Sequence, residues 1–288
     1  QLNGWSYGYA AFVVLSGIIA LRRPAAPVMS SRKGMAPRPG WKLQLLWVAL
    51  AADASALLLA VTNYISQNVA AVPLLWILPL SLYLLSMILC FEGGNWYRRF
   101  LFLRFAAVAL GGMAFALSPD FVNAGPMLQI PLFCASLFIC CMACHGELAK
   151  LKPEPEHLTL FYLMVSLGGA IGGVFVGVVA PYAFRGFYEL PIAMAACAIL
   201  LWIVLHSDPA TIFYRARMQP PSLVFTALVA LLIVSLFVVI GKQAGETILT
   251  VRNFYGVLRV RDHVATDIEP QRRELLNGTI LHGVEIMA

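Results

Sequence analysis

Apolar runs long enough to cross a bilayer recur along the whole chain. A hydrocarbon layer about 30 Å thick is spanned by roughly 17–25 helical residues. Of the 288 residues, 60% are apolar and only 12% are charged, whereas a soluble domain has about 25% charged residues. The sequence therefore predicts an all-α polytopic membrane helix bundle in residues 1–241. About eight spans are expected, at 5–21, 43–62, 72–91, 103–118, 127–145, 159–181, 190–206 and 222–241.

Basic residues are distributed unevenly between the two sets of alternating loops. Before the last span, one set holds only Arg185. Because loops rich in Lys and Arg stay in the cytoplasm, the basic set is predicted to be cytoplasmic, and Gln1 and the segment after Gly241 to lie outside. The net charge of +6 is read as a topology signal, so lipid and not nucleic acid is the expected partner. The basic set has thirteen members: Arg22, Arg23, Arg32, Lys33, Arg38, Lys42, Arg98, Arg99, Arg104, Lys150, Lys152, Arg215 and Arg217.

The pattern changes after the last span. "ETILTVRNFYGVLRVRDHV" is rich in β-branched and aromatic residues and is broken at Tyr255-Gly256, and "RRELLNGTILHGVEI" carries an Asn277-Gly278 turn signal. Residues 247–288 are therefore predicted to form a three-stranded antiparallel meander. We expect residues 242–288 to be the start of an extramembrane domain and the chain to be an internal piece of a longer protein.

Several long segments resemble one family. "LAVTNYISQNVAAVPLLWILPLSLYLLSMILCFE", "CHGELAKLKPEPEHLTLFYLMVSLGGAIGGVFVGVVAP" and "VRNFYGVLRVRD" followed by "RRELLNGTILHG" resemble the bacterial fused MFS-like/spermidine synthase membrane proteins. The resemblance implies a location in the bacterial inner membrane, further spans before Gln1, and a spermidine-synthase-like domain after Val251. In such a membrane, the charge rule places the tail on the periplasmic side. In soluble synthases a small β domain precedes a Rossmann-like fold with the decarboxylated S-adenosylmethionine site and the catalytic aspartate.

The catalytic part of that family is not found in this sequence. No Gly-rich loop follows a strand, and Leu281 and His282 occupy the region where soluble synthases tend to place a substrate-contacting Gln. The expected function is a non-catalytic integral membrane module of a spermidine-synthase-like protein. Two alternatives remain open: a structural or accessory subunit that binds other membrane subunits, or a polyamine or cation transporter.

The segment Cys141-Met-Ala-Cys144-His145 spells the pattern that attaches a c-type haem covalently. Haem attachment takes place outside the cytoplasmic membrane, but these residues fall at the predicted cytoplasmic end of an apolar span. We therefore expect no haem and no other cofactor. Cys141, Cys144 and His145, with Glu147 nearby, remain alternative metal ligands because thiolates and imidazole suit Zn or Cu. The favoured interpretation is a helix end where His145 and Glu147 meet the membrane interface.

Asp53 lies halfway along an otherwise apolar span, where a charge costs about 2.5–3.5 kcal/mol on insertion scales. With Asn63 and Gln67 towards the outer end of the span, it forms a candidate intramembrane polar site for a proton or cation. A single hydrogen bond from a protonated Asp53 to another helix is the alternative.

Glycines recur within "SLGGAIGGVFVGVVAP" at the spacing of close helix contacts. We expect a neighbouring helix to approach there, with the groove built by Gly169, Gly173 and Gly177. The full set is Gly168, Gly169, Gly172, Gly173 and Gly177.

Overall fold

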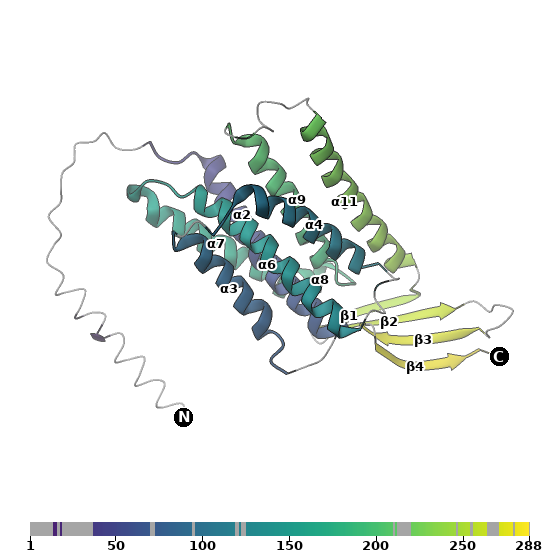
Figure 1. Ribbon diagram of the computed structural model, residues 1–288. Helices are drawn as coiled ribbons and strands as arrows, with labels where there is room; N and C mark the ends of the chain where they lie inside the picture. The colour runs from purple at the N-terminus through teal and green to yellow at the C-terminus, as the bar shows by residue number, and fades with distance from the viewer. Residues whose placement is uncertain are drawn as a thin grey trace. The chain divides into compact units, whose positions relative to one another are not determined.

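The computed structural model (Figure 1) describes residues 14–15, 18, 37–69, 73–93, 96–118, 121, 125–209, 211, 220–245, 247–253, 256–263, 271–278 and 280–287. The chain divides into two units, Gln1–Arg38 and Pro39–Ala288. The first expected span, 5–21, lies almost entirely outside the described residues; Val14, Leu15 and Ile18 are helical. Everything that follows concerns the second unit.

Apolar helices make up most of the second unit. Six helical segments of its described part are long and apolar enough to cross a membrane, and a shorter apolar helix follows the first of them. The chain is therefore a multi-pass membrane protein, and its helices occupy the seven expected spans after the first. They are α2 (Trp41–Tyr64), α3 (Ile77–Phe91), α4 (Arg99–Ala116), α6 (Pro126–Lys150), α7 (Leu158–Val174) continued through a π-helical turn into α8 (Ala180–Ala183), α9 (Glu189–Ser207) and α11 (Pro220–Gly245).

Small residues set the packing of α2 against α7. A side chain at Gly168 would collide with the Val48 carbonyl, and one at Gly172 would collide with the Ala52 carbonyl. Without a hydrophobic force between helices in lipid, such close backbone approach supplies the packing energy. Gly169, Gly173 and Gly177 instead have open space where a side chain would be. The expected close approach is present, but the expected register is wrong by one residue.

One end of the bundle is held by a charged network. Arg99, the first residue of α4, forms an ion pair with Glu147 of α6 at 2.8 Å and another with Asp208, just after α9. The Tyr97 hydroxyl donates to Glu147 at 2.7 Å. Burial, and then the Glu147 carboxylate, raise the pKa of Tyr97 above its ordinary value, so the phenol keeps the proton that it donates.

Four strands follow the helices, in the order β1-β2-β3-β4, and every neighbouring pair is antiparallel. They are β1 (Leu249–Asn253), β2 (Gly256–His263), β3 (Arg272–Asn277) and β4 (Ile280–Ile286), and they lie at the end of the bundle where α11 stops (Figure 1). The predicted antiparallel meander is correct, but three strands were expected. The break at Tyr255-Gly256 separates two strands because Asn253 pairs with Gly256 across a hairpin.

Candidate functional site

A buried carboxyl group lies in the middle of α2. Asp53 is 5% exposed, and its Oδ2 accepts a hydrogen bond from the Cys144 thiol of α6 at 3.7 Å. Its other oxygen, Oδ1, has no hydrogen-bond partner among the described residues. A buried polar atom without a partner costs about 1–3 kcal/mol, so this oxygen points to a role beyond packing.

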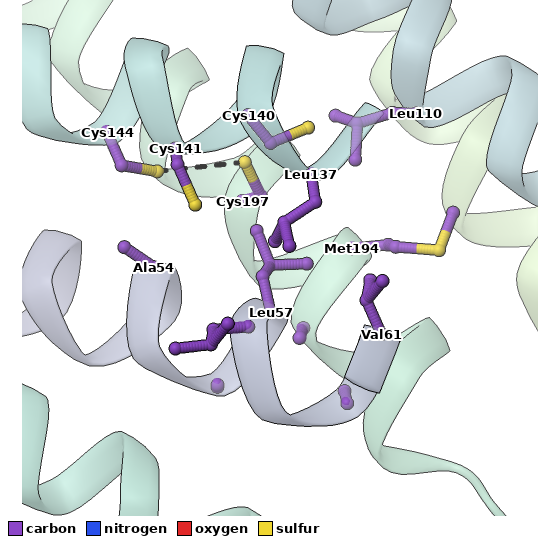
Figure 2. Packing of buried hydrophobic residues seen from close by; sticks show 14 of the residues in the cluster. Ala54, Leu57, Val61, Leu110, Leu137, Cys140, Cys141, Cys144, Met194 and Cys197 are labelled. Atoms are coloured by element: carbon purple, nitrogen blue, oxygen red, sulfur yellow. Dashed lines mark hydrogen bonds between the residues drawn. The ribbon is translucent and has the colours of Figure 1, made fainter. Parts of the chain in front are cut away.

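Two further thiols complete the cluster from α6 and α9. The sulfurs of Cys144 and Cys197 are 3.9 Å apart, and the buried Cys140 lies next to Cys197. One carboxylate oxygen of Asp53 and the sulfurs of Cys144 and Cys197 all lie within 4.8 Å of one another. We call Asp53, Cys140, Cys144 and Cys197 the thiol–carboxyl cluster. Figure 2 shows its three cysteines and the hydrogen bond between Cys144 and Cys197.

Apolar side chains surround the cluster. Ala54 and Leu57 of α2, Leu137 of α6 and Met194 of α9 are buried in the same core, and Figure 2 shows them around the sulfurs. In such a medium an isolated charge is strongly disfavoured. The cluster can therefore hold a proton on its carboxyl group, or a thiophilic cation whose charge the thiolates balance.

The structure does not gather the expected polar site of Asp53, Asn63 and Gln67. At about 1.5 Å per residue, Asn63 lies roughly 15 Å and Gln67 roughly 21 Å along the helix from Asp53. The Gln67 Oε1 is instead near the sheet, 3.3 Å from where a Cβ on Gly256 would lie. The neighbours of Asp53 are instead thiols from two other helices, and a proton or cation role for Asp53, Asn63 and Gln67 stays a prediction.

The residues of the Cys-x-x-Cys-His segment face different neighbours. His145 Nδ1 is hydrogen-bonded to Ser86 Oγ of α3 at 2.9 Å, and its ring packs edge-on against Tyr83. Cys144 instead faces Asp53 of α2 and Cys197 of α9. Cys144 and His145 therefore do not converge on one ligand position. Cys141 is buried as well. The position of His145 and Glu147 at the membrane interface stays a prediction. Both side chains are covered by protein: Ser86 and Tyr83 of α3 contact His145, and Tyr97 and Arg99 bind Glu147.

A buried ion pair joins the sheet to the helix bundle. Arg252 of β1 binds Glu189, the first residue of α9, through two hydrogen bonds of 2.9 and 2.8 Å. The two side chains are 5% and 2% exposed. Arg252 also donates to the Gly186 carbonyl and lies over the Phe187 ring, 4.9 Å from its centre. We call this contact the sheet–bundle junction.

Sequence reasoning missed both the partners of Asp53 and the junction. Cys197 is a single cysteine in an apolar helix, and nothing in its local sequence marks it. The usable signal was the rule that an intramembrane carboxyl group has a partner on another helix. For Glu189, the signal was an acidic residue at the start of an apolar helix, where it complements the helix dipole.

No model of a protein family, no curated protein and no solved structure matches this chain.

Proposed function

We propose that this chain is the integral membrane module of a spermidine-synthase-like protein, and that it anchors an extramembrane β domain without catalysing aminopropyl transfer itself. The segment resemblance supports the family. The multi-pass bundle followed by an antiparallel sheet supports the division into anchor and domain. The segment resemblance supports a bacterial inner membrane, and the basic loops support a sheet on the periplasmic side.

The sheet–bundle junction is the observation that carries the anchor role. A guanidinium with two hydrogen bonds to one carboxylate is held in position and orientation, and the Gly186 carbonyl and Phe187 ring restrict it further. Removing one partner of a buried ion pair costs about 3–5 kcal/mol because the other charge is left unpaired. A buried contact of this kind is expected where the sheet is fixed to the bundle, and not where it is a flexible tail.

The charges of the described sheet support a non-catalytic chain. Aminopropyl transfer needs a carboxylate that deprotonates an amine beside a bound sulfonium donor. The Asp262 carboxylate instead binds Arg273 at 2.7 and 2.8 Å. Glu274 pairs with Arg272 at 2.9 Å. The Asp262–Arg273 pair joins β2 to β3, whereas Arg272 and Glu274 both belong to β3.

Limited proteolysis of the purified chain in detergent tests the anchor role. We expect Arg252→Ala and Glu189→Gln to release the sheet at least tenfold faster than the wild-type protein. Arg273→Ala is the matched control, because it removes an arginine of the same sheet whose hydrogen bonds among the described residues go to Asp262 of β2, and it should leave the cleavage between α11 and β1 unchanged. Equal cleavage rates for Arg252→Ala and Arg273→Ala would exclude the junction as the anchor.

A further inference from the structure

We propose that the thiol–carboxyl cluster is a binding site for a thiophilic metal cation, Zn²⁺, held by Asp53, Cys144 and Cys197. The site ties α2, α6 and α9 together in the middle of the bundle. It does not depend on the anchor role, which rests on different residues.

The spacing of the donor atoms fits tetrahedral zinc. With Zn–S bonds of about 2.3 Å and Zn–O bonds of about 2.0–2.2 Å, the edges of the tetrahedron are about 3.8 Å between sulfurs and about 3.5 Å between sulfur and oxygen. The observed separations are 3.9 Å between Cys144 and Cys197 and 3.7 Å between Cys144 and Asp53. Two of the three separations therefore match a tetrahedral site to within a few tenths of an ångström, and the third, between the Asp53 oxygen and the Cys197 sulfur, is within 4.8 Å.

The chemistry of the donors selects the cation. Thiolates favour Zn²⁺ and Cu⁺ over the hard cations that oxygen ligands bind. The thiolates of Cys144 and Cys197 offset the two charges of Zn²⁺, which removes most of the cost of placing the ion in an apolar interior. Binding displaces the thiol protons to solvent. The carboxyl group of Asp53, with an oxygen that lacks a partner among the described residues, supplies the third ligand.

The structure brings three protein ligands together. Cys140 lies one helical turn before Cys144 on α6 and next to Cys197, but its sulfur is outside the group of atoms that lie within 4.8 Å of one another. Three protein ligands leave one position of a tetrahedral ion open. Because the three ligands come from α2, α6 and α9, we assign the ion a role in holding these helices together.

Metal analysis of the full chain tests the site. The protein is purified in detergent from cells grown with Zn²⁺ and dialysed against a weak chelator, and its metal content is measured by mass spectrometry. About one zinc per chain is expected. Protein from cells grown with Co²⁺ should show thiolate-to-cobalt charge-transfer absorption together with the visible bands of tetrahedral cobalt.

Variants assign the ligands. Cys144→Ala, Cys197→Ala and Asp53→Asn should each lose at least tenfold in zinc content. Cys134→Ala is the matched control, because Cys134 is a buried cysteine of the same helix outside the cluster, and it should keep its zinc. The cobalt spectrum of the wild-type protein tests for thiolate ligands even if a variant fails to fold. Wild-type protein with neither zinc nor cobalt bands would overturn the proposal, as would zinc retained without Cys144 and Cys197, or a Cys144–Cys197 disulfide in protein isolated under thiol-blocking conditions.

Discussion

Gly172 of α7 lies directly against the backbone carbonyl of Ala52 of α2, with no room for a side chain between them. Gly168 lies in the same way against Val48, one turn earlier. On the next residues of α7, the Gly169 carbonyl accepts a hydrogen bond from Ser55 at 3.0 Å, and the Cα of Gly173 faces open space. Neighbouring glycines therefore tolerate substitution very differently.

Gly172→Ala should destabilise the purified protein by about 1–3 kcal/mol, because the added methyl group forces α2 and α7 apart. Gly173→Ala adds the same methyl group on the open side and should be neutral or slightly stabilising, since Ala favours a helix over Gly. The midpoint of thermal unfolding in detergent measures both. Equal midpoints for the two variants would contradict the observed register.

Alkaline phosphatase fused after Ala288 should be active, because the charge asymmetry of the loops predicts an external tail. The measurement is phosphatase activity in whole cells, with a fluorescent cytosolic reporter at the same junction as the control. A fusion after Lys152, in a loop of the basic set, should be inactive. Inactive phosphatase after Ala288 together with a fluorescent reporter there would place the sheet in the cytoplasm.

Purified protein should carry no covalent haem at Cys141 and Cys144. The two thiols are enclosed within the bundle, whereas attachment needs both thiols and the following histidine to reach one porphyrin. Haem staining of a denaturing gel checks this, with Cys141→Ala as the specificity control. A stained band in the wild-type protein that Cys141→Ala removes would refute it.

The chain should not convert putrescine and decarboxylated S-adenosylmethionine into spermidine. Chromatography of the methylthioadenosine co-product measures the reaction, and a soluble spermidine synthase serves as the positive control. Product formed by the purified chain, and abolished by heating, would show that catalysis does not need the Rossmann-like domain.

Acid should weaken the contact between β2 and β3. The hydrogen bonds from Arg273 lower the pKa of Asp262 below its ordinary value of 3.8. The carboxylate therefore stabilises the folded sheet above pH 3.8, and this contribution is lost as the pH falls through the lower, folded-state pKa. Because both side chains are at the surface, the effect should be small. The measurement is the protection of the β2 and β3 amides against hydrogen exchange, relative to the intrinsic exchange rate at each pH. Between pH 5 and pH 2 this protection should fall in the wild-type protein and not in the Arg273→Ala control.

The helices were predictable because a membrane span is a property of local composition. Runs such as 127–145 and 190–206 match α6 and α9 within a few residues at most ends. The missed strand has a local cause as well. The Tyr255-Gly256 break was recognised, but a break within a strand and a hairpin between two strands look alike when their pairing is unknown.

The contacts between helices were much less predictable. Two registers of glycine at a spacing of four residues run along α7, and the sequence cannot tell which one faces α2. Asp53 was identified correctly as an unusual residue, but its partners lie 91 residues away at Cys144 and still further along the chain at Cys197. Partners so distant in sequence leave no periodic signal, because their contact depends on how whole helices are arranged.

The pairing of α2 with α7 also orders events during biosynthesis. Ser55 and Gly169, which are hydrogen-bonded across this contact, are separated by 114 residues. At about 5–20 residues per second, a ribosome needs roughly 6–23 s to make the intervening chain. During that interval α3, α4 and α6 enter the membrane while the alanine-rich face of α2 has no α7 to pack against. The surface of α2 that Gly168 and Gly172 contact in the finished bundle is therefore without its partner helix while about 40% of the 288 residues (114 of 288) are being made.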